Sequence, residues 1–196
     1  MNKNYLLCGV GGQGTVLAAK VIAEAAIARG EEVKTTETIG MAQRGGPVTS
    51  FVRTGENIHS PIIPLGRADA ILGFEPGEVV RNLSYLKPGG TVVVNSKAQM
   101  PVTAALTGSD YNGKEMIGYL QKCGARVIIV DGEALCRECG SEKVLNVILL
   151  GAAIASGAVD ITAEEAEKAL LSRLPERLHE LNRKALGLGM KNGGTE

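Results

Sequence analysis

The sequence contains no tryptophan, and its aromatic content is only 3%. It therefore lacks the aromatic platform on which single-stranded nucleic acids stack. Its 21 basic and 21 acidic side chains cancel to a formal net charge of zero, so no overall field attracts the protein to nucleic acid or to a membrane surface. We expect neither class of partner.

The chain also lacks an apolar stretch long enough to span a bilayer, and residues 1–4 lead directly into a strand-like segment without a secretory leader. We therefore expect a soluble cytoplasmic protein. Cysteine is scarce, with four residues at Cys8, Cys123, Cys136 and Cys139. In a chain without an export signal these cysteines are expected to be free thiols rather than a disulfide framework.

Several catalytic signatures are missing. The sequence has no Gly-x-Ser-x-Gly elbow, no HExxH helix and no GxxxxGK[ST] loop. The two histidines, His59 and His179, have no carboxylate nearby in sequence to make either a general base. Cys136 and Cys139 form one CxxC pair, without the second pair or the matching histidine that a zinc or iron-sulfur site needs. We assign no catalytic residue and predict no metal site.

Glycine, by contrast, is abundant, with 26 residues. The apolar run at residues 5–8 leads into Gly9-Val10-Gly11-Gly12-Gln13-Gly14, after which apolar residues recur at helical spacing. This pattern predicts a strand, a glycine turn and a helix. Gly30 is placed to end that helix, and residues 33–37 read as a second strand, which gives a βαβ unit.

The rest of the chain continues this alternation. Further strands are predicted over residues 48–53, 68–74, 91–95 and 126–131, and helices over 75–86, 114–122 and 143–156. Two more helices follow Thr162 and Pro175. The predicted fold is α/β and Rossmann-like, a mostly parallel sheet flanked by helices with a helical C-terminal region. We expect a single domain over residues 1–188 and a flexible tail over 189–196.

The spacing Gly9-x-Gly11-x-x-Gly14 matches the dinucleotide-binding fingerprint. Glycines there let the backbone approach a pyrophosphate, and the helix N-terminus offers free N–H groups to an anion. The motif favours a phosphate-bearing ligand, although it also occurs where a strand and a helix simply pack closely. Glu37, at the end of the second predicted strand, could accept a hydrogen bond from a ribose hydroxyl. A stand-alone NAD(P)- or FAD-binding protein is therefore an alternative.

A second glycine-rich segment, residues 40–46, places Gln43 and Arg44 between Gly40 and the pair Gly45-Gly46. Loops that follow parallel strands share the carboxyl edge of the sheet, so this loop and the first glycine turn could face one ligand or one partner. The competing interpretation is an ordinary surface loop.

Taken together, the two glycine segments resemble the gamma-type domain of the pyruvate/2-ketoisovalerate ferredoxin oxidoreductase family, and the form Gly-Met-Ala-Gln-Arg-Gly-Gly resembles the small (beta) subunits of its indolepyruvate type. The resemblance covers residues 5–187 and includes the segments Ser60-Pro61-Ile62-Ile63-Pro64 and Glu75-Pro76-Gly77-Glu78. The chain departs from the usual pattern at Ile39, where histidine is common, and at Gly77, where a bulkier residue is common.

The resemblance implies a subunit that is inactive alone. Its complex would convert a 2-oxoacid, indolepyruvate or another arylpyruvate, and coenzyme A into acyl-CoA and carbon dioxide, with electrons passing to ferredoxin. Thiamine diphosphate and the iron-sulfur clusters would belong to a larger catalytic subunit, in agreement with the missing Gly-Asp-Gly thiamine signature and cluster spacing. An adenylate-handling domain that also uses a glycine-rich first turn is a further alternative. The residues expected to contact coenzyme A or the partner subunit are Gly11, Gly12, Gln13, Gly14, Thr15, Arg44, Gly45 and Gly46.

Overall fold

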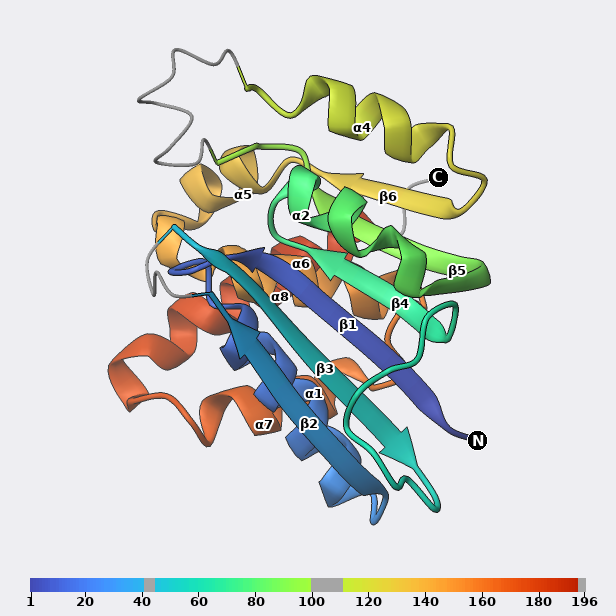
Figure 1. The fold of residues 1–196 in the computed structure, drawn as a ribbon. Helices are drawn as coiled ribbons and strands as arrows, with labels where there is room; N and C mark the ends of the chain where they lie inside the picture. The colour runs from blue at the N-terminus through green and yellow to red at the C-terminus, as the bar shows by residue number, and fades with distance from the viewer. Residues whose placement is uncertain (41–44, 100–110, 194–196) are drawn as a thin grey trace.

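The computed structural model describes residues 1–40, 45–99 and 111–193. Its centre is a six-stranded sheet in the order β2-β3-β1-β4-β5-β6 (Figure 1). The strands are β1 (Lys3–Val10), β2 (Glu32–Ile39), β3 (Pro47–Gly55), β4 (Ala68–Gly73), β5 (Leu86–Asn95) and β6 (Arg126–Val130).

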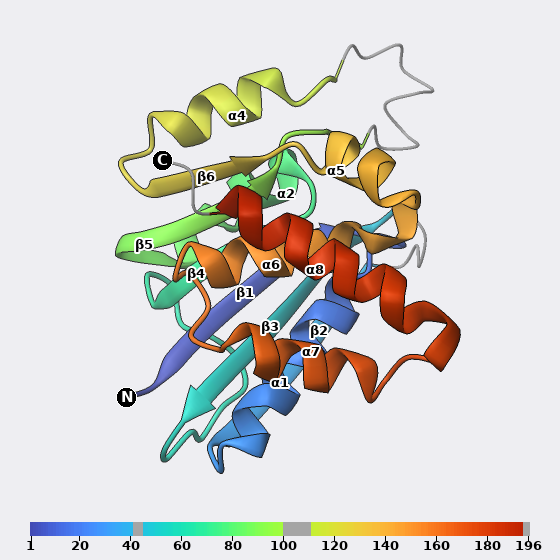
Figure 2. The ribbon, with the colours of Figure 1, turned by 180° about the vertical axis from the view of Figure 1, so that it is seen from behind.

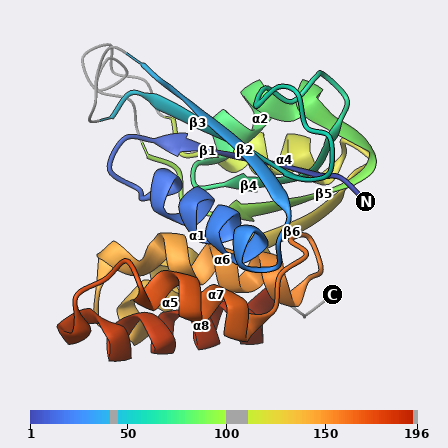
Figure 3. The ribbon, with the colours of Figure 1, turned by 90° about the horizontal axis from the view of Figure 1, so that it is seen from below.

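Helices cover both faces of the sheet. Those in the described ranges are α1 (Thr15–Ala28), α2 (Pro76–Asn82), α4 (Lys114–Gln121), α5 (Gly132–Cys139), α6 (Leu145–Ala155), α7 (Ala163–Leu171) and α8 (His179–Gly193). Helices α2 and α4 lie on one face, and the other five lie on the opposite face (Figures 2 and 3). Short 3-10 turns occupy Leu83–Tyr85, Glu142–Val144 and Glu176–Leu178. None of the described helices combines the length and apolar character needed to cross a membrane.

The predicted α/β architecture is confirmed, and all but one of the strands run in the same direction. The exception is β3, which pairs antiparallel with both β1 and β2. It returns from β2 as a hairpin and inserts between β2 and β1. The predicted crossover from β1 through α1 to β2 therefore exists, but it skips one strand. The chain then reverses direction across the sheet and adds β4, β5 and β6 on the other side of β1, each parallel to its neighbour.

Alternation along the strands divides the core between the two faces. Leu6 and Cys8 of β1 belong to the cluster beneath α2 and α4, whereas Tyr5 and Leu7 belong to the larger cluster beneath the five-helix layer. Successive side chains of a strand point to opposite faces, so a sheet covered on both sides is apolar at consecutive positions. This explains why β1 reads as an unbroken apolar run in the sequence.

The helix predicted over residues 75–86 is shorter than expected. Helix α2 ends at Asn82, and β5 begins at Leu86, so Pro88, Gly89 and Gly90 lie inside a strand rather than ending a helix. The pairing of β5 with β4 shifts register in this stretch, and Gly89 has a φ of 73°. A left-handed glycine at an irregularity keeps the strand paired on both sides of it.

The C-terminal tail was predicted to begin at residue 189, but α8 continues to Gly193. The reason is a close contact with α6. A Cβ atom on Gly189 would lie 2.0 Å from the Ile148 carbonyl oxygen, and one on Gly193 would lie 2.2 Å from that of Ala152. Glycines that look like tail residues in the sequence are here the surface on which two helix backbones meet.

Candidate functional site

The first glycine turn joins β1 to α1 at the carboxyl edge of the sheet. Gly12 and Gly14 have φ angles of 105° and 82°, which residues with a Cβ rarely adopt. Gly14 is the N-cap of α1, and no side chain caps this helix. The first turn of α1 also contains no acidic residue. The positive end of the helix dipole is therefore open to an anion.

The second glycine loop lies directly beside this turn. The Gly11 N–H donates to the Gly46 carbonyl at 2.8 Å, and the Gly45 N–H donates to the Gly11 carbonyl at 3.2 Å. These bonds extend the antiparallel ladder of β1 and β3 beyond the last strand pair, Val10 with Pro47. The two loops thus share one edge of the molecule, as the sequence predicted. Arg44 lies outside the described residues, and its role remains a prediction.

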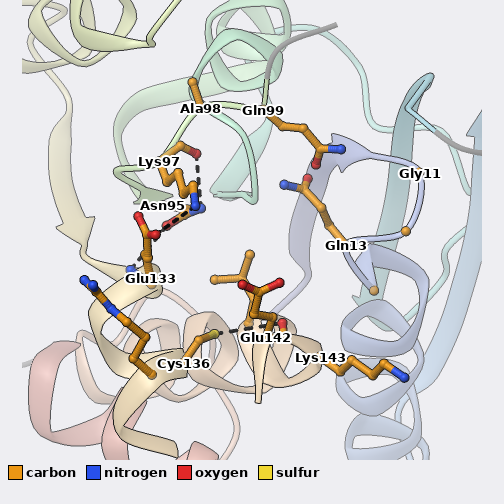
Figure 4. Close-up of a pocket in the computed structure, with 15 residues that line it drawn as sticks. Gly11, Gln13, Asn95, Lys97, Ala98, Gln99, Glu133, Cys136, Glu142 and Lys143 are labelled. Carbon is orange, nitrogen blue, oxygen red and sulfur yellow. Dashed lines mark hydrogen bonds and ion pairs between the residues drawn. The ribbon is translucent and has the colours of Figure 1, made fainter. Parts of the chain in front are cut away.

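A cleft of about 790 Å³ opens at this edge, between the glycine turn and the ends of β5 and β6 (Figure 4). It lies beside β1, where the chain changes direction across the sheet, a common position for ligands in open α/β sheets. The side chains of Gln13 and Gln99 point toward one another across it, and that of Glu142 points into it (Figure 4). Its lining comprises Gly11, Gly12, Gln13, Gly14, Asn95, Lys97, Ala98, Gln99, Gly132, Glu133, Cys136, Arg137, Glu142, Lys143 and Leu145.

A chain of side-chain hydrogen bonds forms the floor of the cleft. The Phe74 carbonyl, just after β4, accepts from Gln13 Nε2 at 3.1 Å and from Asn95 Nδ2 at 3.3 Å. Asn95 Oδ1 in turn accepts from the Gly132 N–H at 3.2 Å, at the start of α5. Gln13 Oε1 also accepts from the Val10 N–H at 2.8 Å. The floor therefore ties the ends of β1, β4, β5 and β6 together.

Glycine is required at two places in this floor. A Cβ on Gly9 would lie 2.6 Å from Gln13 Oε1, and one on Gly132 would lie 2.6 Å from Asn95 Oδ1. Both contacts are shorter than a Cβ atom can make. The amide side chains of Gln13 and Asn95 can lie flat against the backbone only because these neighbours are glycines.

Polar atoms without partners flank the glycine turn. Within the described part of the chain, the buried atoms Thr15 Oγ1 and Asn146 Oδ1 accept or donate no hydrogen bond. Asn146, on α6, approaches the turn from below and donates from Nδ2 to the Gly14 carbonyl at 3.4 Å. Buried polar atoms usually have hydrogen-bond partners. Two such atoms without partners, beside a helix start without a cap, indicate that the turn has a role besides packing β1 against α1.

The rim of the cleft is charged. Lys97 pairs with Glu133 at 2.9 Å. Arg137, Lys143 and Glu142 also line the cleft and are exposed, and Lys143 points away from the cavity (Figure 4). Of these charged groups, Lys97 and Arg137 balance Glu133 and Glu142, and Lys143 adds a positive charge only at the outer rim.

The two thiols of the CxxC pair are buried on α5. Burial, together with the charges of Cys139 and Glu142, raises the pKa of Cys136 to about 11. Burial also raises the pKa of Cys139, against the opposing influence of Lys184. Each sulfur lies near a backbone carbonyl, that of Glu142 at 3.9 Å and that of Leu181 at 3.6 Å. A protonated, partnered thiol is a poor nucleophile. Among the described residues, no group of three His, Cys, Asp or Glu side chains could hold a metal ion.

Glu37 is not positioned for the ribose contact predicted for it. Because β3 separates β2 from β1, Glu37 lies two strands from the glycine turn, roughly 10 Å along the sheet. Its side chain is exposed and lines a separate hollow between α1 and β2. A nicotinamide or flavin dinucleotide held by the turn would therefore lack the acidic partner that the motif normally supplies.

Asn95, Gly132 and Asn146 are functional candidates that the sequence patterns did not single out as site residues. Asn95 carries a recognisable signal, because it is a polar residue at the end of a buried strand in a parallel sheet. Gly132 follows the next strand in the same way. Asn146, in contrast, lies in an apolar helix far along the chain, and only the packing of α6 against α1 brings it to the turn.

Residues 4–192 match the family model described as pyruvate ferredoxin/flavodoxin oxidoreductase. Among curated proteins, the indolepyruvate oxidoreductase subunit IorB of Pyrococcus horikoshii is 34% identical over 190 residues, which cover 96% of this chain and 94% of that protein.

Solved structures agree. The keto/oxoacid ferredoxin oxidoreductase gamma subunit of Geobacter sulfurreducens superposes with a TM-score of 0.72 at 29% identity, covering 97% of this chain and 98% of that one. The 2-oxoglutarate:ferredoxin oxidoreductase of Magnetococcus marinus, solved with 2-oxoglutarate, coenzyme A and succinyl-CoA bound, shares the fold with a TM-score of 0.77 at 20% identity. There the match covers 98% of this chain but only 31% of the longer chain.

Proposed function

The chain belongs to the pyruvate ferredoxin/flavodoxin oxidoreductase family as the small subunit of a 2-oxoacid:ferredoxin oxidoreductase, and we propose that its glycine-turn cleft holds the nucleotide end of coenzyme A. The observation that carries this proposal is the uncapped start of α1, which faces a charged cleft and is flanked by two buried oxygen atoms without partners, Thr15 Oγ1 and Asn146 Oδ1. Backbone N–H groups in this arrangement bind phosphate.

The complex would convert a 2-oxoacid and coenzyme A into acyl-CoA and carbon dioxide and pass the electrons to ferredoxin. Indolepyruvate is the substrate we propose, because the full-length relatives include indolepyruvate oxidoreductase subunits. Thiamine diphosphate, which stabilises the carbanion left by decarboxylation, and the iron-sulfur clusters would belong to a larger partner subunit. This chain's own residues would bind and orient the coenzyme, so that its thiol reaches the partner's active site.

In this role Gly12 and Gly14 bring backbone N–H groups close to a phosphate without intervening side chains, whereas the Gly11 N–H is bonded to the Gly46 carbonyl and holds the two loops together. Gln13 has a different part, because its amide is already bonded to Val10 and Phe74. It keeps the turn in shape and leaves binding to the backbone. The loop that contains Arg44, Gly45 and Gly46 would complete the site or contact the larger subunit.

Assembly tests the function as a whole. Co-expression with a candidate large subunit should yield a complex that forms acyl-CoA from indolepyruvate and reduces ferredoxin, and a screen of 2-oxoacids should identify the preferred substrate. A small chain that never joins such a partner contradicts the proposal. Calorimetry of the isolated chain with NAD, NADP and FAD tests the alternative, since micromolar binding of any of them would favour a stand-alone dinucleotide protein.

A charge reversal tests the site. Lys97→Glu places a carboxylate at the rim of the cleft and should raise the KM for coenzyme A about threefold to tenfold, as expected for one exposed charge near a phosphate. Lys87→Glu is the matched control, because Lys87 lies at the start of β5, at the opposite edge of the sheet from Lys97, and is likewise paired with an acid, Asp69. Equal effects of the two variants would place the coenzyme elsewhere.

A further inference from the structure

The absence of a side chain at Gly77 leaves a space that the hydroxyl of Tyr111 fills. It lies in the first turn of α2, and a Cβ atom there would lie 2.7 Å from the hydroxyl oxygen of Tyr111 and 3.1 Å from Glu75 Oε2. The phenol hydroxyl therefore sits against the α2 backbone, in a position that only glycine leaves open.

The Tyr111 hydroxyl is held by a buried carboxylate. It donates to Glu75 Oε1 at 2.5 Å, while Glu75 Oε2 accepts from the Glu78 N–H at 2.9 Å and so caps α2. Glu75 is only 3% exposed. Burial, and then the hydrogen bond and charge of Glu75, raise the pKa of Tyr111, so that the phenol keeps its proton further into the alkaline range. Hydrogen bonds to a charged acceptor are stronger than neutral ones, especially when they are buried.

This contact lies next to the cleft. Glu75 follows Phe74, whose carbonyl is the centre of the hydrogen-bonded floor. Two residues after Tyr111, Gly113 packs so closely on the cleft residue Ala98 that a Cβ would lie 2.7 Å from the Ala98 Cβ. The chain leaving the cleft rim and the chain returning to α4 therefore meet at Ala98 and Gly113. Tyr111 anchors that returning chain to the floor.

We propose that Tyr111, seated in the space left by Gly77 and bonded to Glu75, is a positioning residue that fixes the cleft rim formed by residues 97–99. The identity of the ligand, coenzyme A, rests on the proposed function. The positioning of the rim by Tyr111 is a property of the chain alone and is independent of the proposed function. Tyr111 touches no reacting atom, so its effect is expected in binding and not in the chemical step.

Tyr111→Phe removes only the hydroxyl. In the isolated full-length chain, hydrogen exchange of a peptide covering residues 97–99 should accelerate about tenfold, as expected for the loss of one charge-assisted hydrogen bond. In the assembled complex, the KM for coenzyme A should rise about threefold to tenfold at unchanged kcat. Tyr119→Phe is the control, because Tyr119 is 57% exposed on α4 and should change neither quantity.

A double variant tests whether the Tyr111 hydroxyl requires the space at Gly77. Gly77→Ala alone should displace the phenol and reproduce the effects of Tyr111→Phe. Once the hydroxyl is absent, the added Cβ faces the ring carbon at 3.5 Å, an ordinary contact, and Glu75 Oε2 at 3.1 Å, which a small shift of the carboxylate released from Tyr111 relieves. Gly77→Ala combined with Tyr111→Phe should therefore be no worse than Tyr111→Phe alone.

Unchanged exchange at residues 97–99 in Tyr111→Phe, or additive damage in the double variant, would overturn the positioning role. Faster exchange with an unchanged KM would overturn the part of the proposal that links the rim to coenzyme A, because the rim would then not matter to the ligand. Faster exchange in a complex that shows no dependence on coenzyme A would instead support the positioning role and contradict the proposed function.

Discussion

Helices α1 and α7 differ in whether side chains cap the N–H groups of their first turns. At α7, the Thr162 side chain accepts from the Glu165 N–H at 3.2 Å, Glu165 accepts in return from the Thr162 N–H at 2.7 Å, and Glu164 adds a second negative charge. At α1, Gly14 offers no side chain and no acid follows it. The start of α7 is capped within the chain, whereas that of α1 has no side-chain cap and so suits the phosphate that we propose there. The lesson is that a missing cap beside a cleft carries as much information as a motif.

The largest effect that bears on this comparison is expected at Gly14. Its φ is 82°, and a Cβ would lie 2.7 Å from Asn146 Nδ2. Gly14→Ala should lower the free energy of unfolding by about 2–4 kcal/mol, because left-handed strain and a steric clash add together. Urea denaturation measures this change.

Gly30→Ala is the matched control. Gly30 has a nearly identical φ of 84°, but nothing lies within 4 Å of its Cβ position. It should lose only about 1 kcal/mol from backbone strain. Equal losses of unfolding free energy in the two variants would show that the Asn146 side chain moves aside at no cost and does not stabilise the turn.

A smaller effect is expected when α1 is made to resemble α7. Val16→Glu adds a carboxylate to the acid-free first turn and should weaken coenzyme A binding about tenfold through repulsion of the phosphates. The free energy of unfolding should change by less than about 1 kcal/mol, since the same charge favours the helix dipole. Val16→Gln, of equal size and without charge, should bind nearly as well as the parent protein. An equal loss in both variants would indicate a steric effect and not an electrostatic one.

The smallest effect is expected at α7. Thr162→Ala removes half of the capping box and should cost about 1 kcal/mol of stability. The KM for coenzyme A in the complex should not change, because α7 lies away from the cleft on the outer helix layer. A raised KM with normal stability would mean that α7 acts on the site, and the contrast between the two helix starts would then lose its functional meaning.

Local patterns were sufficient for much of this fold. The glycine turn, the capping box at Thr162 and the apolar strands were predicted because each depends on residues adjacent in sequence. The direction of β3 was not predicted, because an apolar run gives no sign of which neighbour it pairs with. The segment Pro88-Gly89-Gly90 was misread for a related reason, since the same residues that end helices also tolerate an irregular strand.

The site was predicted only in part. Gly11, Gly12, Gln13 and Gly14 line the cleft, and their contact with a coenzyme stays a prediction. Asn95 and Gly132 join them through contacts between strand ends that are far apart in sequence. The structure shows that Gln13 uses both ends of its amide within the fold, which no spacing rule reveals. A sequence motif indicates which turn could bind a ligand. The packing around that turn determines which of its side chains have hydrogen-bonding groups available to the ligand.

The close contact between α6 and α8 has a consequence for how this protein is made. Asn146, which reaches up to the Gly14 carbonyl, is carried by α6, and α6 is supported from below by the backbone of α8 at Gly189 and Gly193. The glycine turn at residues 9–14 is thus braced by a helix at residues 179–193. We expect a nascent chain to expose an unfinished cleft until α8 has been synthesised, so that assembly with other polypeptides begins only after α8 has packed against α6.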